Sequence, residues 1–250
     1  MVDNYFTEQQ QHTEQYLLPY FDKHIPDFRN KTVLEIGCAE AGLLNVLHGL
    51  GMHVRGVELL KERAAIANEV NPDLVVHVAD ATDPRLPEIV GETFDIIIMR
   101  ETLEHIPDRI PLFNNIDRLL KPGGFYYVTF PPYFSPFAGH QQGGTTFLRR
   151  VPWLHFLPGF VLRPLGKLFK EKDWLIDFVL VNRRDGISIA KFEQLCRRYR
   201  LEPVVKELFF TRPVYQVRFN MKTRRFPNIP IIREFLALGC ECLLRKNDKM

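Results

Sequence analysis

Short apolar runs alternate with amphipathic segments along the first half of the chain. Each run is rich in β-branched and aromatic residues and predicts a strand, whereas the stretches between the runs place apolar residues at helical spacing. This alternation is typical of a sheet covered by helices. The predicted strands are residues 33–36, 53–58, 74–79, 94–99 and 125–130.

The C-terminal part continues this pattern with one helix and further strands. Ser188 is the predicted N-cap of a helix over 189–199, because its hydroxyl can accept a hydrogen bond from a free helix amide. Strands near 202–210 and 214–221 are predicted to form a terminal antiparallel hairpin. The tail, 228–250, is predicted as a C-terminal helix that opens with a proline.

An α/β domain is expected over residues 30–250. One further segment precedes it and another is inserted within it. Residues 1–29 predict an N-terminal helical flap, which either packs on the domain edge or covers a ligand with Tyr5, His12 or Tyr16. Residues 131–187 form an insertion far longer than the usual connection after a strand. Aromatic side chains alternate there with Arg and Lys, so it is expected to be a lid over an apolar substrate, a membrane-contacting surface, or a plain helical subdomain.

The turn after the first predicted strand consists of small residues. Gly37-x-Ala39-x-x-Gly42 is a degraded form of the dinucleotide fingerprint, in which the middle glycine admits a pyrophosphate. The middle position here is Ala39, and Glu35 and Glu40 would place carboxylates beside the anion. A ligand with positive charge fits better. S-adenosylmethionine, with its sulfonium and ammonium groups, is such a ligand.

Polar residues follow the next three predicted strands at the same edge of the sheet. Glu58, about 20 residues after the glycine turn, can accept hydrogen bonds from both hydroxyls of a ribose. Asp80 with Ala81 can receive an adenine amino group, or Asp80 can form an ordinary Asx turn. Arg100 and Glu101 begin the acid-rich turn after the fourth strand and are further candidates for cofactor binding.

The acceptor side of the predicted site has two candidate bases. His105, in the turn after the fourth strand, has an unperturbed pKa that suits a general base, although a hydrogen-bonded spacer is the alternative. His140 is the second candidate base. Tyr133, His140 and Gln141 leave the sheet at its ligand-binding edge and are candidate substrate contacts, with an ordinary proline-stiffened loop as the alternative.

Together these motifs resemble a class I S-adenosylmethionine-dependent methyltransferase, within the small-molecule branch that includes the ubiquinone-type enzymes. The resemblance covers roughly residues 30–130 and includes the Leu-Glu-His of the turn after the fourth strand and the Lys-Pro-Gly-Gly at 121–124. It implies a Rossmann-like, seven-stranded, mostly parallel sheet with a terminal antiparallel hairpin, to which this sequence adds the helical insertion after strand five.

The resemblance also implies roles for the residues at the strand ends. Glu35, Gly37 and Ala39 would hold the methionine part of S-adenosylmethionine, Glu58 the ribose, and Asp80 with Ala81 the adenine. One departure concerns the turn, where Ala39 and Ala41 replace two of the family's usual glycines. This change narrows the loop without abolishing the site.

Composition excludes several other function classes. The net charge of +3 is too small to argue for nucleic acid. The four cysteines show neither metal-ligand spacing nor a paired framework, so no metal is predicted and a reducing cytoplasm is expected. No apolar run reaches the roughly 18 residues of a membrane span. The expected location is cytoplasmic, or peripheral at the inner face of a membrane through 145–180 or the C-terminal helix.

The predicted function is methyl transfer from S-adenosylmethionine to a small-molecule acceptor that is lipophilic or linked to a lipid or glycan. Methylation at oxygen, nitrogen or carbon is left open, as is the oligomeric state. A non-catalytic adenosyl-binding or regulatory module is the alternative. An NAD-dependent oxidoreductase ranks third, because Ala39 and Glu40 disfavour it.

Overall fold

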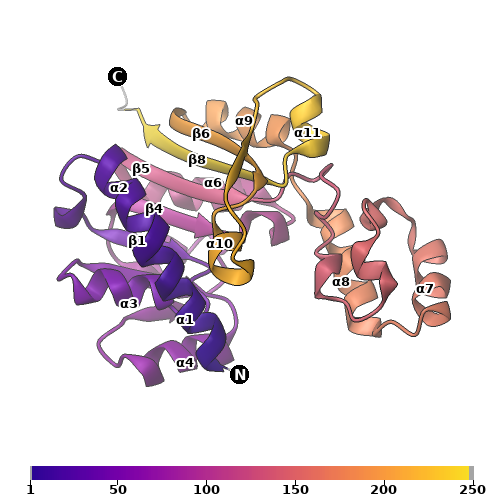
Figure 1. Cartoon of the computed structure of the whole chain (residues 1–250). Helices are drawn as coiled ribbons and strands as arrows, with labels where there is room; N and C mark the ends of the chain where they lie inside the picture. Colours follow the sequence, from indigo (N-terminus) through magenta and orange to yellow (C-terminus); the bar gives the residue numbers. More distant parts are fainter. Residues whose placement is uncertain (1, 248–250) are drawn as a thin grey trace.

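An eight-stranded sheet runs through the protein, in the order β3-β2-β1-β4-β5-β8-β6-β7 (Figure 1). The computed structural model describes residues 2–247, and side chains from Tyr5 onward. The α/β class is the predicted one, with eight strands instead of seven. The strands are β1 (Val33–Ile36), β2 (Val54–Glu58), β3 (Val76–Val78), β4 (Phe94–Arg100), β5 (Leu120–Phe130), β6 (Leu201–Thr211), β7 (Arg224–Phe226) and β8 (Gly239–Lys246).

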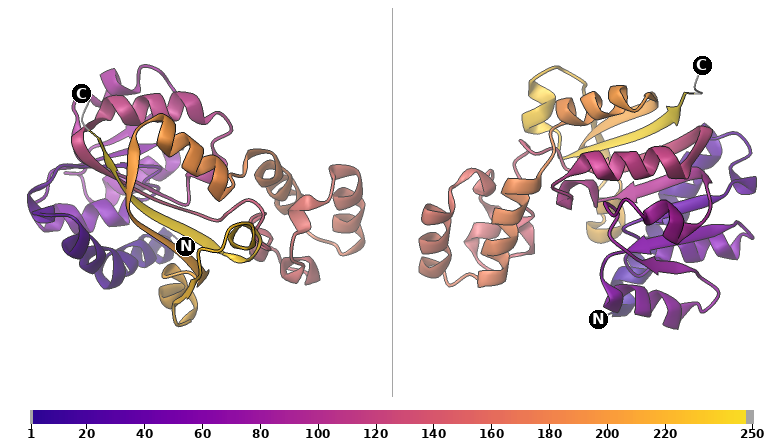
Figure 2. Two further views of the ribbon diagram at one scale, coloured as in Figure 1. Left: turned by 90° about the horizontal axis from the view of Figure 1, so that it is seen from above. Right: turned by 180° about the vertical axis from the view of Figure 1, so that it is seen from behind.

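Helices cover both faces of the sheet and bury one apolar cluster on each. The two views of Figure 2 show the sheet between these helical layers. One face carries α5 (Leu86–Val90), α6 (Arg109–Leu119) and α9 (Ile189–Arg198), and the other carries α3 (Gly42–Gly49), α4 (Lys61–Val70) and the N-terminal helices. Local signals start two of them: the Asp108 side chain accepts from the Ile110 amide at α6, and Ser188 Oγ accepts from the Lys191 amide at α9, as predicted.

The first five strands are parallel, and β1 lies between β2 and β4. Val33 is paired with Val54 on one side and with Ile96 on the other. All four residues of β1 are buried, as expected of a strand covered on both faces. Because parallel strands end at one edge of the sheet, the residues that close β1, β2 and β4 meet there.

The tail corrects one prediction, because residues 239–246 form a strand and not a C-terminal helix. β8 is inserted between β5 and β6 and is antiparallel to both. Cys240, Cys242 and Leu244 pack into the cluster on one face, while Leu243 packs on the other. Only the short helix α11 (Ile232–Leu236) precedes it. The antiparallel pair at the end of the sheet consists of β6 and the short edge strand β7.

Residues 214–221 correct a second prediction, since they do not form the other strand of a hairpin. Their alternation of Val, Tyr and Phe suggested a strand, yet Val214–Phe219 is the helix α10. Pro213 adopts the helical conformation at its start, and Asn220 ends it in the left-handed region, with φ of 51°. In Figure 1, α10 lies beside the N-terminal helix.

The N-terminal segment was predicted as a helical flap over residues 1–29, and its described part, from Val2, begins with helices. It consists of α1 (Val2–His12), a π-helical turn (Thr13–Leu17) and α2 (Leu18–His24). Leu17 and Phe21 are fully buried in the cluster that also contains α3. Near the start of the segment, Gln9 Oε1 accepts a hydrogen bond of 2.8 Å from the Gly42 amide. The helix α1 is thereby held against the turn that follows β1.

The insertion after β5 projects from one end of the domain in every view (Figures 1 and 2). It contains α7 (Gly159–Leu168) and α8 (Asp173–Asp185), with a small apolar cluster of its own that includes Leu162 and Leu175. Arg109 of α6 donates a hydrogen bond to the Asp185 carbonyl, so the end of α8 is fastened to the sheet domain. Among the described residues, no helix is both long and apolar enough to cross a bilayer.

Candidate active site

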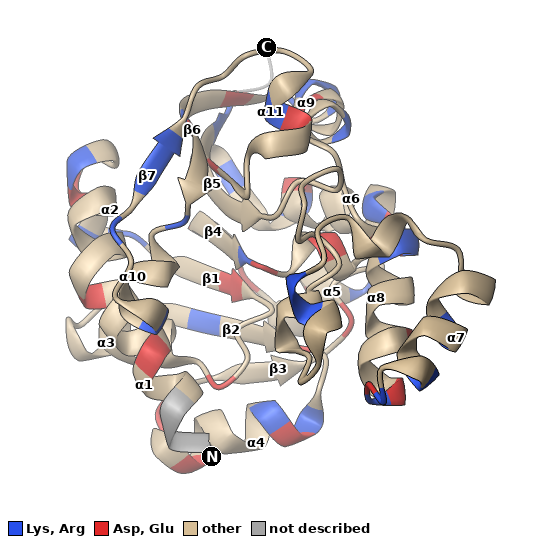
Figure 3. Ribbon diagram, turned by 45° about the vertical axis from the view of Figure 1, so that its right-hand side comes forward, with Lys and Arg blue, Asp and Glu red and all other residues tan. Residues whose placement is uncertain are grey.

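A cavity with an empty volume of about 680 Å³, here named the inner cavity, lies at the edge where β1 and β4 end. The sheet contributes Glu35, Gly37, Arg100 and Glu101 to its wall, which are four of the eight residues predicted to bind the cofactor. Figure 3 shows the acidic segment of β1 close to the basic segment at the end of β4. The cavity therefore has a strongly polar floor.

Gly37 has a backbone conformation that brings the turn after β1 close to the floor of the inner cavity. Its φ is +74°, a conformation that glycine adopts without strain. A Cβ at this position would lie 2.4 Å from Thr102 Oγ1. Ala39 and Ala41 also have positive φ, of 55° and 61°, which explains why glycine is common at such positions. The turn thus retains the conformation of a glycine loop although two of its residues are alanine.

Glu35 and Arg100 form a buried ion pair under the cavity. Arg100 donates from Nε at 3.0 Å and from Nη2 at 2.7 Å, both to Glu35 Oε1. Burial raises the pKa of Glu35, and the Arg100 guanidinium counteracts this only in part. The second oxygen, Oε2, is buried and has no hydrogen-bond partner among the described residues. A donor from a ligand would satisfy it.

Glu101 is held by a second arginine, which comes from the end of β6. Arg212 donates to Glu101 Oε2, and Thr129 Oγ1 donates to Oε1 at 3.2 Å. Burial raises the pKa of Glu101, but the adjacent Arg212 guanidinium lowers it below its usual value. Glu101 is therefore an ionised carboxylate with a fixed orientation, and Arg212 ties the antiparallel part of the sheet to the site.

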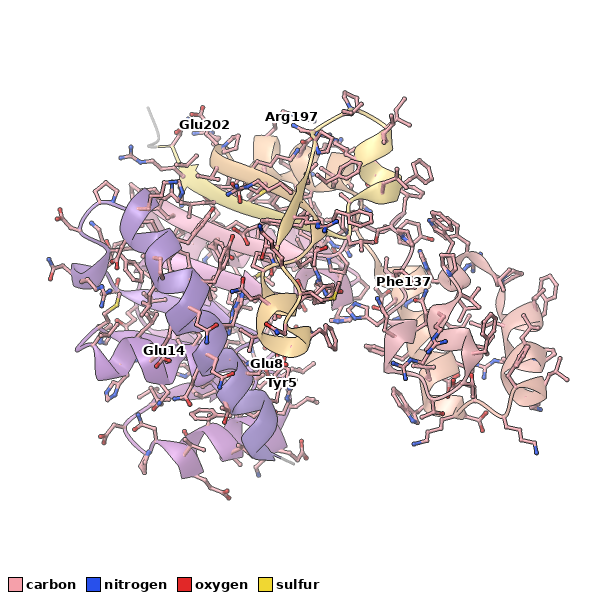
Figure 4. All side chains as sticks on the ribbon, viewed as in Figure 1. Tyr5, Glu8, Glu14, Phe137, Arg197 and Glu202 are labelled. Carbon is pink, nitrogen blue, oxygen red and sulfur yellow. The ribbon has the colours of Figure 1, made fainter. Side chains whose placement is uncertain are left out.

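The helix α1 forms the roof of the inner cavity. Tyr5, Glu8, Gln9 and His12 line it, and the labels of Figure 4 place Tyr5 and Glu8 beside α10. Arg218 of α10 donates to Glu8 at 2.7 Å, so an ion pair joins the two helices over the site. Burial lowers the pKa of His12 to about 3. This side chain is therefore neutral at physiological pH.

Four other predicted cofactor residues lie outside the wall of the inner cavity. Glu58 accepts from the Ala39 amide at 2.9 Å and from the Leu60 amide at 3.0 Å, so it fastens the glycine turn. Each carboxylate oxygen keeps a lone pair for a ribose hydroxyl. Asp80 Oδ1 accepts from the amide and hydroxyl of Thr82 in an Asx turn, and Ala81 follows it. Oδ2 of Asp80 remains available for a ligand.

The two predicted bases meet at a buried carboxylate that the sequence analysis did not single out. Glu104 Oε1 lies 3.9 Å from His105 Nε2 and 3.7 Å from His140 Nε2. The three groups are close enough together to hold a divalent cation as well. Burial, reinforced by Glu101, raises the pKa of Glu104 well above its usual value. Both imidazoles have lowered pKa values because they are buried, that of His140 to about 3.

The insertion positions this histidine pair. Phe178 of α8 packs on both rings, with centroids 5.6 Å from His105 and 5.6 Å from His140. The other two predicted substrate residues, Gln141 and Tyr133, make contacts within the insertion. Gln141 is fully buried and donates to the carbonyls of Pro136 and Val151, and the Tyr133 ring packs against insertion residues. The structure places His140 in the wall of the outer cavity, whereas Gln141 and Tyr133 support the loop.

A second cavity, here named the outer cavity, lies between the insertion and α10. Its empty volume is about 1430 Å³. Arg212 and Arg218 line both cavities, so the two spaces meet at these side chains. His140 lines the outer cavity together with Phe137, which Figure 4 places at the junction with the insertion. A donor bound inside and an acceptor bound outside would therefore meet near Arg212 and Arg218, with His140 in the wall of the outer cavity.

Comparison with known proteins identifies the family. The pattern that defines the family described as "Methyltransferase domain" matches residues 6–174, which is more than half of the chain. The chain belongs to this methyltransferase family. The resemblance to class I methyltransferases predicted from the sequence is thus confirmed.

Individual relatives support the same classification. The chain is 31% identical over 118 residues to a ubiquinone biosynthesis O-methyltransferase of Paraburkholderia phytofirmans, across 45% of this chain and 49% of the relative. It is 34% identical over 112 residues to phosphoethanolamine N-methyltransferase 2 of Caenorhabditis elegans, across 43% of this chain and 25% of the relative. The chain therefore spans about half or less of the length of these relatives.

A solved structure shows the same fold. The geranyl diphosphate C-methyltransferase of Streptomyces coelicolor A3(2), crystallised with Mg²⁺, geranyl diphosphate and S-adenosyl-L-homocysteine, matches with a TM-score of 0.54. The match covers 94% of this chain and 79% of that chain at 15% identity. At this identity the likeness establishes the architecture of the methyltransferase alone.

Several residues of the site were not found from the sequence. Arg212 and Arg218 lie more than 100 positions after Glu101, and nothing in their local pattern marks them as part of the cavity. Glu241 also lines the inner cavity, where burial raises its pKa to about 7 and Tyr16 donates to it at 2.8 Å. Glu104 was also missed, but the sequence contained a usable signal for it, namely its position beside His105 in an acid-rich turn.

Proposed function

We propose that the protein transfers a methyl group from S-adenosylmethionine to a small-molecule acceptor with lipophilic character. The proposal rests on Oε2 of Glu35, which is buried and has no hydrogen-bond partner within the part of the chain that the structure describes. A buried carboxylate oxygen in the wall of a cavity favours a cationic ligand with N–H donors, which describes the ammonium end of S-adenosylmethionine. Membership of a methyltransferase family supports the same cofactor.

The geometry also sharpens the argument against a pyrophosphate cofactor. Glu40 was expected to repel phosphate, but it accepts two hydrogen bonds from Arg63, the shorter at 3.0 Å, so its charge is compensated. Glu35 faces the inner cavity directly and retains an unsatisfied oxygen. Glu35 in β1 therefore disfavours a nicotinamide dinucleotide at this site, whereas Glu40 in the turn does not.

The residues of the site would support methyl transfer mainly by orientation and by exclusion of water. When bound, the sulfonium donor supplies an electrophilic methyl group, so alignment with the acceptor is the principal requirement. The Glu8–Arg218 and Glu101–Arg212 pairs hold both arginines where the inner cavity meets the outer one. The outer cavity leaves room for an acceptor, which favours an enzyme over a blocked adenosyl-binding module.

The histidine pair is proposed as the base for an acceptor hydroxyl. His105 and His140 are neutral at physiological pH, and their Nε2 atoms face the Glu104 carboxylate. Glu104 acts as a positioning residue, because its Oε1 lies 3.9 Å from His105 Nε2 and 3.7 Å from His140 Nε2. Relatives named for O-, N- and C-methylation leave the accepting atom open. For a neutral amine acceptor, neither histidine is required.

Calorimetric titration tests the cofactor. S-adenosylmethionine and S-adenosylhomocysteine should bind and NAD should not, and binding of NAD alone would overturn the proposal. A labelled-methyl transfer assay against a cell extract, separated into lipid, glycan, protein and RNA fractions, identifies the acceptor class. Label is expected in the lipid or glycan fraction.

Substitution of the histidines provides a test of the base. With a hydroxyl acceptor, His105→Ala and His140→Ala should each lower turnover about 100-fold, which is a typical contribution of a general base. Affinity for S-adenosylhomocysteine should remain within about twofold, because neither ring holds the donor. His53→Ala is the matched control, since His53 forms only a surface pair with Glu92. Loss of affinity without loss of turnover would argue against the catalytic role.

Peripheral membrane contact remains a proposal for the insertion alone. Phe160 and Leu168 of α7 are 82% and 73% exposed, which is unusual for large apolar side chains. The tail can no longer supply an amphipathic C-terminal helix, because residues 239–246 lie inside the sheet.

A further inference from the structure

The outer cavity combines uncompensated positive charge with exposed aromatic surface. We infer that it binds an amphipathic anion, that is, a ligand with an apolar body and a phosphate, diphosphate or carboxylate group. The inference rests on the proposed function, because it names the class of acceptor that would meet the methyl donor.

The charge comes from the insertion. Arg212 and Arg218 are neutralised by Glu101 and Glu8, which leaves two further arginines in the wall. Arg149 and Arg150 are exposed and form no ion pair with any residue in the described part of the chain. None of the residues described as lining this cavity is acidic. The insertion side of the cavity therefore attracts an anion, and paired guanidinium groups suit phosphate and carboxylate geometry.

The apolar surface comes from both sides of the same cavity. Trp174 of α8 is 55% exposed, and Phe219 of α10 is 63% exposed. Met221 lies just after α10 and is also exposed. Large side chains with this much contact with water are stabilised when an apolar ligand covers them. Aromatic walls with a few placed charges are typical of small-molecule sites.

The position of His140 orients the ligand. Arg149 and Arg150 lie on the insertion, in the turn Phe147–Arg150, whereas Arg212 lies where the outer cavity meets the inner one. The anionic group would bind at the free arginines. The methyl-accepting atom would then lie toward His140, beside the donor.

The test compares three soluble probes by calorimetry: dodecyl phosphate below its micelle concentration, dodecanol and inorganic phosphate. Dodecyl phosphate should bind about 10-fold more tightly than dodecanol, which corresponds to one charge-assisted hydrogen bond. The double variant Arg149→Ala/Arg150→Ala should lose this preference. Lys167→Ala/Arg183→Ala removes the same charge from exposed positions of the insertion that do not line the cavity, and should retain it.

The affinity for S-adenosylhomocysteine, measured on the same variants, separates the two proposals. Unchanged affinity in all variants shows that they are folded and that the donor site is intact. Absence of S-adenosylhomocysteine binding in the unmodified protein would overturn the proposed function, whatever the probes show. If the donor product binds, equal binding of dodecyl phosphate to both double variants would overturn the inference alone.

A vesicle arm distinguishes a membrane from a free ligand. Flotation with vesicles of phosphatidylglycerol and phosphatidylcholine measures attraction to an anionic surface. Flotation combined with no binding of monomeric dodecyl phosphate would also overturn the inference, because the arginines would then serve a lipid surface and not a cavity.

Discussion

Replacing Gly37 with alanine is expected to lower the free energy of unfolding by about 3 kcal/mol and to weaken S-adenosylhomocysteine binding at least ~100-fold. Two costs add in this variant. The backbone keeps φ at +74°, which strains any residue with a side chain. The new Cβ would also meet Thr102 Oγ1 at 2.4 Å and Cγ2 at 2.6 Å, and backbone or side chain must shift.

The shift would reach the donor site. Thr102 Oγ1 donates to the Arg100 carbonyl at 3.0 Å, so its displacement moves the residues that hold Glu35. Gly51→Ala is the matched control, because Gly51 also has a positive φ, of 80°, but nothing lies within 4 Å of its Cβ position. That variant should lose about 1 kcal/mol of stability and no affinity. Chemical denaturation and calorimetry measure both quantities. Equal losses in the two variants would show that the contact with Thr102 is unimportant.

Removal of the Arg100 charge is expected to have the second large effect. Arg100→Gln leaves the Glu35 carboxylate, which is 1% exposed, without its cation, and such a break typically costs about 3 kcal/mol. The pKa of Glu35, already raised by burial, should rise further. Protonated Glu35 offers the ammonium group of the donor no charge, so affinity for S-adenosylhomocysteine should fall about 10-fold or more at neutral pH.

The stability loss in this variant should depend on pH. A carboxyl whose pKa is raised in the folded state stabilises the protein below its unfolded pKa, here 4.5, and loses this contribution as pH rises through the folded pKa. The deficit of Arg100→Gln relative to the unmodified protein should therefore shrink as pH is lowered toward 4.5. Denaturation curves between pH 4.5 and 8 measure it. A deficit that grows on acidification would contradict the assignment.

Two further variants isolate the role of the ion pair. Glu35→Gln/Arg100→Gln removes both charges and should recover most of the stability but none of the affinity. Arg29→Gln breaks a two-hydrogen-bond pair with Asp22 at the surface, where both side chains are more than 40% exposed, and should cost less than about 1 kcal/mol. If the double variant binds S-adenosylhomocysteine normally, Glu35 does not hold the cofactor.

The parallel half of the fold was predictable because its signals are local. The run Phe94–Arg100 is almost entirely apolar and forms β4, and acids stand directly after or at the ends of neighbouring strands. Since parallel strands end at one edge, the sequence predicts Glu35 and Glu101 at the same edge of the sheet. Both residues line the inner cavity.

There is a physical reason why the antiparallel half could not be predicted from the sequence. β8 is stabilised by pairing with β5 and β6, which lie far away in the sequence, and Glu241 interrupts its apolar pattern. α10 has the composition of a strand, yet it is a helix held by contacts from both ends, including Arg212 with Glu101 and Arg218 with Glu8. Tertiary pairing overrides propensity in both segments.

The sequence by itself determined the α/β class, the family and the acidic edge of the sheet, because these depend on periodicity and on residues within a few positions of each strand. Only the tertiary structure decided which arginines neutralise those acids and that Glu104 faces both histidines. It also decided that Arg149 and Arg150 lie beside an aromatic wall and form no ion pair with the residues that the structure describes. These properties depend on distances between segments that are far apart in the chain. Burial and charge pairing in the folded protein, and not local pattern, set the chemistry of the site.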